Sequence, residues 1–187
     1  MGLREEKKAA TRELLSDVAT GLFVERGFDA VTVADVAEAA RVSVNTVFNY
    51  FPTKEDLFFD RQDVVVGRLA AAARDGGVTG VRDAFLAELR REEATTGLSG
   101  AAGFWAVVEG SPALQARLRL IGELAEAALA EALGGDPEAR VVAAVVAGVD
   151  RALHAEIRRR VVAGEAPAAV REAVGELASR AYGRIGF

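Results

Sequence analysis

The stretch VTVADVAEAARVSVNTVFNYFPTKEDL, residues 31–57, decides the fold that this sequence predicts. Thr32 and Asp35 stand three residues apart, the spacing of a capping box at the start of a helix. Ser43 can cap a second helix, and that helix must end before Pro52, because proline disfavours helical geometry in the residue before it. Helices this short do not persist alone, since nucleation is costly. We therefore predict that they pack together as a helix-turn-helix, which offers its second helix to the DNA major groove.

A third helix is predicted to follow Thr53, which has Asp56 three residues on, and to continue to about residue 74. We expect no flexible linker along this helix. A movement of its later part would therefore tilt the second short helix of the motif, which we call the reading helix. On this basis the predicted domains are a DNA-binding domain, 1–53, and a helical domain, 54–187. Effector binding and dimerisation are the roles that a family resemblance of the motif implies for the second domain.

The motif resembles the TetR family of bacterial transcriptional regulators. The likeness is carried by Thr32, Val36, Ala37, Ala40, Val42, Ser43, Thr46, Phe48, Tyr50, Phe51, Lys54, Glu55 and Leu57, and upstream by LLSDVATGLFVERGF, residues 14–28. It covers roughly the first third of the chain at motif level. The resemblance implies a ligand-responsive regulator, most often a repressor, that binds a palindromic operator as a homodimer and is released by a small apolar effector.

One position departs from the family pattern. Such motifs commonly have glycine after Ala40, where the backbone adopts a positive φ, and this chain has Arg41. A left-handed conformation there should cost about 1 kcal/mol. Arg41 could also place a cation near the DNA backbone, although a solvated turn residue is the alternative.

Composition limits the classes of protein that this sequence could belong to. Of its 187 residues, 51% are hydrophobic and 27% are charged, which is typical of a globular chain. The absence of cysteine excludes disulfide scaffolds and thiolate metal sites, and it fits a cytoplasmic location. No apolar run reaches the ~20 residues that span a bilayer, and the N-terminus lacks the apolar segment of a secretory signal. A net charge of −5 predicts only a few phosphate contacts per subunit.

Prolines and glycines divide the rest of the chain into helical segments. Pro112, Pro137 and Pro167 each stand where a helix can begin. No stretch shows a sustained alternation of apolar and polar residues, so we predict an all-α fold of about nine helices. The segments outside the motif are expected at about 4–26, 79–95, 100–110, 112–133, 137–162 and 167–183. The first is expected to pack on the reading helix through Leu14, Val18, Leu22 and Phe23.

The DNA contacts are predicted from the side chains that the second short helix should expose. Asparagine pairs with adenine edges, threonine and valine can meet a thymine methyl group, and hydroxyls bind phosphate. We assign Val44 and Asn45 to base edges. The complete predicted set is Thr32, Arg41, Ser43, Val44, Asn45, Thr46, Phe48, Asn49, Tyr50 and Lys54. Capping alone is the alternative role of Thr32 and Ser43, and core packing is the alternative for Tyr50.

Two further sets of residues follow from helical spacing and from the resemblance. An apolar effector cavity is predicted to be lined by Phe85, Phe104, Trp105, Val108, Leu118 and Ile121, with an ordinary helical core as the alternative. Residues 140–149, RVVAAVVAGV, are apolar nearly all round and should be covered on two sides, the second side by a partner subunit. The predicted dimer interface comprises Val142, Val145, Val146, Val149, Leu153, Val170, Val174 and Leu177.

An enzyme is not expected. The chain has one histidine, His154, which should lie at a surface or interface, and no second histidine or cysteine that could complete a metal site. No phosphate-binding glycine loop or nucleophile motif is present, so we predict neither cofactor nor metal. Three rival functions remain open: a DNA-binding module controlled by a protein partner, an unregulated one, and a transcriptional activator.

Overall fold

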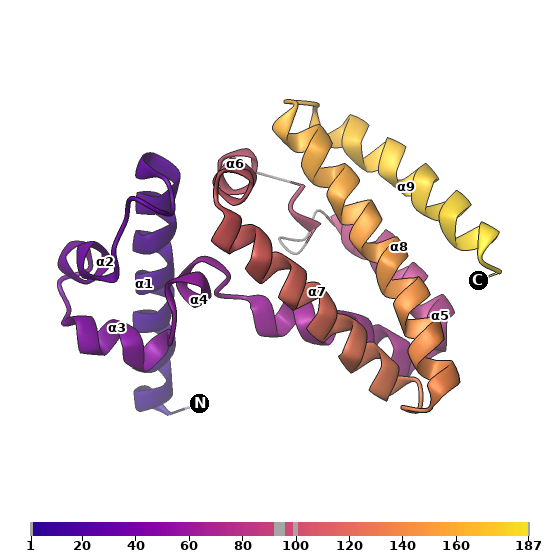
Figure 1. Cartoon of the computed structure of the whole chain (residues 1–187), viewed down its shortest axis with the longest axis horizontal. Coiled ribbons are helices and arrows are strands. Elements are labelled where there is room, and N and C mark those ends of the chain that lie inside the picture. The colour runs from indigo at the N-terminus through magenta and orange to yellow at the C-terminus, as the bar shows by residue number, and fades with distance from the viewer. Residues whose placement is uncertain (1, 92–95, 99–100, 187) are drawn as a thin grey trace. The chain divides into compact units, whose positions relative to one another are not determined.

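The computed structural model describes residues 2–91, 96–98 and 101–186, and every regular element in these ranges is a helix (Figure 1). The helices are α1 (Leu3–Arg26), α2 (Val33–Ala39), α3 (Val44–Tyr50), α4 (Lys54–Phe58), α5 (Gln62–Arg91), α6 (Ala102–Gly110), α7 (Pro112–Ala132), α8 (Pro137–Val162) and α9 (Pro167–Arg184). The all-α prediction is confirmed. The predicted helix end near residue 95 and the predicted start at residue 100 lie outside the described residues.

The chain divides into two compact units. Unit 1 comprises Met1–Gln62 and Ala106–Arg117, and unit 2 comprises Asp63–Trp105 and Leu118–Phe187. Unit 1 therefore contains α1 to α4 together with the end of α6 and the start of α7. It extends beyond residue 53 because α4 packs on α1. The division of DNA binding and effector binding at residue 53 stays a prediction.

Three phenylalanines form the centre of unit 1. The ring centroid of Phe23 lies 5.0 Å from that of Phe28 and 5.8 Å from that of Phe58, and the last two are 6.0 Å apart in an edge-to-face arrangement. Such pairs stabilise a core by roughly 0.5–1.5 kcal/mol each beyond the area that they bury. The prediction that Leu14 packs inward was wrong, because Leu15 is buried there and Leu14 is 48% exposed.

The predicted continuous helix from residue 54 to about 74 is interrupted. Helix α4 ends at Phe58, Phe59 leaves helical geometry at ψ 53°, and α5 begins at Gln62. The buried ring of Phe59 lies edge-to-face on Phe58 at 5.1 Å, which fixes this turn. The prediction of one continuous helix through α4 and the first part of α5 was therefore wrong. Helix α5 also loses helical geometry at Gly76 and Gly77, where the glycines predicted a break.

The turn between α2 and α3 is a Schellman motif. The Val42 amide donates to the Ala37 carbonyl at 2.9 Å, and the Arg41 amide donates to the Glu38 carbonyl at 3.0 Å. Arg41 occupies the left-handed position of this motif with φ 57°, and it is the only residue other than glycine with positive φ in the described ranges. The expected positive φ is confirmed, and the arginine is strained where glycine would not be.

Unit 2 is built around α8 and α9, which pack along each other. One cluster of buried residues joins these helices to α5 through Phe85, Leu153 and Tyr182. A second cluster joins α5, α7 and α8 through Leu69, Leu129 and Val146. Between them these clusters use the inward faces of four helices, which leaves the outward faces of α7, α8 and α9 to solvent or to a partner.

A charged cluster lies inside unit 2. The Arg68 guanidinium donates to both carboxylate oxygens of Asp150 at 2.6 Å and to Glu88 at 3.0 Å, and its side chain is 9% exposed. The Nδ1 atom of His154 lies 3.4 Å from the same Asp150 carboxylate. Burial raises the pKa of Asp150, but the charges of His154 and Arg68 outweigh it and hold the pKa well below its ordinary value. His154 was predicted at a surface or interface, and it lies half-buried in this cluster instead.

We expect Arg68→Met to lower the free energy of unfolding by about 3–5 kcal/mol, because it removes the cation that Asp150 and Glu88 share in the core. The matched control is Arg151→Met, whose exposed pair with Glu126 should contribute less than about 1 kcal/mol. Urea unfolding at one fixed protein concentration measures both, since association changes apparent stability. Equal losses in the two variants would contradict the assignment.

We expect Arg41→Gly to raise the free energy of unfolding by about 1 kcal/mol, because glycine relieves the left-handed strain of the turn. Glu38→Gly, on the exposed surface of neighbouring α2, is the control and should lower it by about 1 kcal/mol through helix propensity. Thermal unfolding of the three proteins gives both differences. A destabilised Arg41→Gly variant would mean that the arginine side chain makes a compensating contact.

Candidate DNA-binding interface

Side chains at the helix starts hold the short helices of unit 1. The Thr32 amide donates to the Asp35 carboxylate at 2.7 Å, and the Asp35 amide donates back to the Thr32 hydroxyl at 3.2 Å. The hydrogen bonds from Thr32 lower the pKa of Asp35, so the carboxylate that closes this capping box stays ionised. The Ser43 hydroxyl accepts from the Thr46 amide at 3.1 Å. Both predicted caps are confirmed.

One face of α3 is exposed and carries the side chains assigned to DNA. Val47 is fully buried and anchors the opposite face of the helix in unit 1. The exposed members are Val44, Asn45, Phe48 and Asn49, while Thr46 and Tyr50 are half-buried at the edges. Thr32, Arg41 and Ser43 are also exposed, beside the starts of α2 and α3. The local geometry therefore presents two amides and two apolar side chains outward on two turns of helix.

Phe48 gives this face an unusual character. Its side chain is 46% exposed, although an aromatic ring of this size is ordinarily buried. It has no hydroxyl with which to contact a phosphate. A ring on the outward face can make apolar contacts with sugars or a thymine methyl group, so it adds area and shape to the surface rather than hydrogen bonds.

Lys54 occupies a place that sequence reasoning did not foresee. Its ammonium group donates to the backbone carbonyls of Phe28 at 2.8 Å and Val31 at 3.0 Å, and it lies 4.1 Å from the centroid of the Phe28 ring. These carbonyls belong to the connection between α1 and α2. Lys54 therefore ties α4 to that connection, and its predicted phosphate contact stays a prediction.

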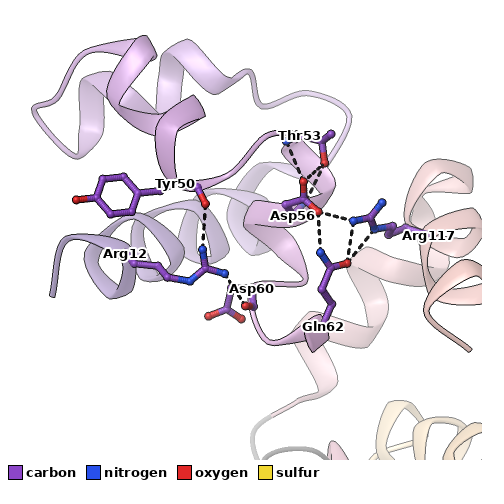
Figure 2. Close-up of polar contacts among 7 residues, drawn as sticks. All are labelled: Arg12, Tyr50, Thr53, Asp56, Asp60, Gln62 and Arg117. Atoms are coloured by element: carbon purple, nitrogen blue, oxygen red, sulfur yellow. Dashed lines mark hydrogen bonds and ion pairs between the residues drawn. The ribbon is translucent and has the colours of Figure 1, made fainter. Parts of the chain in front are cut away.

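Arg12 is a second structural cation that the motif did not reveal. Its guanidinium donates to the Tyr50 carbonyl at 3.0 Å and to the Asp60 carbonyl at 2.8 Å (Figure 2). The guanidinium also stacks 4.2 Å from the centroid of the Phe51 ring. Tyr50 ends α3, and Asp60 follows α4, so Arg12 holds both ends of the segment that carries α4. The Tyr50 ring points away from these contacts (Figure 2).

The predicted effector-lining residues do not all gather in one unit. Val108 belongs to unit 1, and the other five belong to unit 2. Phe85 is fully buried and lies 5.4 Å from the His154 ring, so it is part of the core. Phe104 and Trp105 are half-buried neighbours at 5.0 Å, and Arg158 stacks on Trp105 at 5.3 Å. Leu118 is half-buried and Ile121 is 4% exposed.

Half of the predicted dimer residues are unavailable to a partner. Val146, Leu153, Val170 and Val174 are at most 2% exposed, because α5, α8 and α9 cover one another inside a single chain. For these four residues the prediction was wrong. Val142 and Val149 are half-buried, while Val145 and Leu177 are 43% and 37% exposed. The outward side of α8 also carries Val141, which is 65% exposed.

No group of three or more acidic or histidine side chains in residues 2–91, 96–98 and 101–186 is arranged to hold a metal ion. In the same ranges, no helix combines the length and apolar character that crossing a membrane requires.

The sequence of unit 1 is similar to sequences of known regulatory proteins. Residues 15–60 match the family model for bacterial regulatory proteins of the tetR family. The HTH-type transcriptional regulator LuxR of Vibrio harveyi is 52% identical over 46 residues, 25% of this chain and 22% of that protein. The HTH-type transcriptional repressor Rv1474c of Mycobacterium tuberculosis is 35% identical over 83 residues, 44% of each chain. The matches thus span less than half the length of these two relatives.

Similarity of the whole fold extends further than similarity of sequence. The crystal structure of NalD, the secondary repressor of the MexAB-OprM multidrug efflux pump in Pseudomonas aeruginosa, superposes with a TM-score of 0.61. The match covers 94% of this chain and 97% of that one at 17% identity, so it speaks for the fold alone. The helix-turn-helix region, residues 15–60, is therefore similar to that of the tetR family of bacterial regulatory proteins, and the helical fold is shared along nearly the whole chain.

Proposed function

We propose that this protein is a DNA-binding transcriptional regulator that acts as a repressor and binds a palindromic operator as a homodimer. The observation that carries the proposal is the exposed face of α3, where Val44, Asn45 and Asn49 project from a helix fixed by a cap and a buried valine. Asparagine recognises adenine edges in the major groove, and valine can meet a thymine methyl group. A relative described as a repressor, Rv1474c, supports this sign of regulation.

The dimer is proposed through the outward sides of α8 and α9. Val141 and Val145 lie one turn apart on α8, and Leu177 lies on α9, all exposed. A two-fold interface would bury these apolar side chains and place two reading helices on half-sites about one helical turn apart, or a multiple of it.

Release by a small apolar effector that binds in unit 2 is the proposed mode of regulation, in a protein that works in the cytoplasm. A ligand can shift the protein between conformers only by the difference in its affinity for them. Control by a protein partner, absence of control, and activation are the alternatives. An unchanged DNA affinity across a broad panel of small molecules would favour the first two.

Selection of bound sequences from random duplex DNA by the purified protein tests the proposal directly. Enrichment of a palindrome at moderate salt is the expected result, and the half-site spacing gives the separation of the reading helices. A folded, dimeric protein that enriches no sequence would overturn the proposed sequence-specific reading.

Two asparagines on α3 provide a matched pair of substitutions. We expect Asn45→Ala to weaken binding to the enriched duplex by about 1–3 kcal/mol and to relax the preference at one base position. Asn49→Ala, one turn further on and equally exposed, should weaken binding to all sequences alike, because we assign it to the phosphate backbone. Repeating the selection and the titrations with both variants separates the roles. If Asn45→Ala keeps the wild-type affinity and site preference, the assignment to base edges is wrong.

A further inference from the structure

The carboxylate of Asp56 is the meeting point of four contacts in unit 1 (Figure 2). It accepts from the Thr53 amide at 3.0 Å and the Thr53 hydroxyl at 2.7 Å, which closes the capping box of α4. It also accepts from the Gln62 side-chain amide at 2.9 Å and forms an ion pair with Arg117. The residue is 8% exposed, so these partners replace nearly all of its water.

Arg117 reaches this carboxylate from α7, far along the sequence. Its Nε and Nη2 atoms donate to the Gln62 side-chain oxygen at 3.1 and 2.8 Å, while Nη2 also contacts Asp56. The Gln62 amide therefore turns its oxygen to the cation and its NH2 group to the carboxylate. Arg117, Gln62 and Asp56 form a closed triangle at the end of the segment that carries α4 (Figure 2).

A second contact fixes the same part of the chain to unit 1. The hydroxyl of Ser111, which is 2% exposed, donates to the carboxylate of Asp29 in the connection between α1 and α2 at 3.1 Å. Ser111 directly precedes α7, and Arg117 lies in its first two turns. The start of α7 is thus held at two points of unit 1: by Asp29, which lies before α2, and by Asp56, which lies in α4 after α3.

Charge makes the Arg117 contact the stronger of the two. Burial raises the pKa of Asp56, but the hydrogen bonds from Thr53 and Gln62 and the charge of Arg117 outweigh it, so the pKa lies below its ordinary value. Without Arg117 the mostly buried carboxylate of Asp56 would lose the cation with which it forms an ion pair. A carboxylate in that position stabilises the cap less well, because its ionised form is less favoured.

The position of α4 decides where α3 lies. A helix of five residues does not hold its own geometry, so its cap and its neighbours must do so. Only three residues, 51–53, separate the end of α3 from the start of α4. Arg12 additionally ties Tyr50 to Asp60 on either side of α4. A shift of Asp56 is therefore passed on to the end of α3.

We propose that Arg117 is a positioning residue for DNA recognition: from α7 it holds α4, and through α4 it sets the orientation of the reading helix α3. The inference rests on the proposed DNA binding by α3. It also makes the start of α7, rather than a continuous helix after α4, the element through which DNA affinity can be adjusted.

The test compares Arg117→Met with Arg119→Met in the full-length protein. Arg119 is exposed on the same helix two residues on, and the same substitution there removes the same charge. Two probes are titrated: the duplex that the wild-type protein enriches and a scrambled duplex of equal length and composition. We expect Arg117→Met to lower affinity for the enriched duplex about tenfold, the effect of losing one charge-assisted hydrogen bond, and to leave the scrambled duplex unaffected. Arg119→Met should change neither.

Equal affinities of the two variants for the enriched duplex would overturn the proposal. A parallel loss on both duplexes would overturn it as well, because partial unfolding lowers all binding alike and a misplaced reading helix does not. Arg117→Lys, which keeps the charge, should recover part of the affinity. If Arg117→Met does not fold, Gln62→Met takes its place, since it removes two hydrogen bonds from Arg117 without stranding a charge. It should shift affinity in the same direction.

Amide hydrogen exchange distinguishes this inference from the proposed function. Arg117→Met should speed exchange at the Phe59 amide, which bonds to the Glu55 carbonyl at the end of α4, by about tenfold. Arg119→Met should not. Should the wild-type protein enrich no duplex while the exchange result holds, the proposed function has failed and the positioning of α4 stands. If the wild-type protein enriches a duplex but Arg117→Met leaves exchange at the Phe59 amide unchanged, the proposed function stands and the positioning of α4 by Arg117 is wrong.

Discussion

Short helices cannot keep their shape in water unaided, and this constraint governs unit 1. Helices α2 and α3 have seven residues each and α4 has five, below the length at which an isolated helix is stable. Each starts at a threonine or serine whose hydroxyl accepts an amide hydrogen. Helix α1 packs on α2 and α4, and α2 packs on α3. Local caps fix where the helices begin. Contacts from distant residues fix how they lie, and recognition of DNA depends on that second property.

Two arginines illustrate how burial decides what an ion pair does. In unit 2, Arg68 is held by two carboxylates at 9% exposure, and breaking that cluster would strand charge inside the core. In unit 1, the Arg117 side chain is 23% exposed and pairs with one carboxylate. Water reaches part of the Arg117 side chain, whereas the Asp56 carboxylate is about as buried as the carboxylates around Arg68. Breaking either contact therefore costs stability, and the cost is smaller where the arginine keeps part of its water.

The features that the sequence predicts correctly are local. Capping boxes and the outward side chains of α3 depend on residues within five positions of each other, so spacing alone reveals them. The left-handed conformation of Arg41 is equally local, but it was expected from the resemblance to the TetR family. The interrupted helix at Phe59 and the inward Lys54 depend on partners from other helices, which spacing does not identify. The prediction that Val146 of α8 lies in a dimer interface was wrong for a related reason. An apolar surface all round a helix predicts two covering neighbours, but not that one chain supplies both for Val146.

Unit 1 has a net negative charge, because residues 1–62 and 106–117 contain nine lysines and arginines against twelve aspartates and glutamates. The orientation of α3 therefore has a larger share in recognition. Affinity for DNA of any sequence comes chiefly from cations placed at phosphates. In this protein Lys54, Arg12 and Arg117 are spent on carbonyls and a carboxylate within the fold. A protein with few free cations gains little from electrostatic attraction, so its preference for one site must come from how well α3 fits the groove. The contacts that set the angle of α3 then matter as much as the side chains that touch the bases.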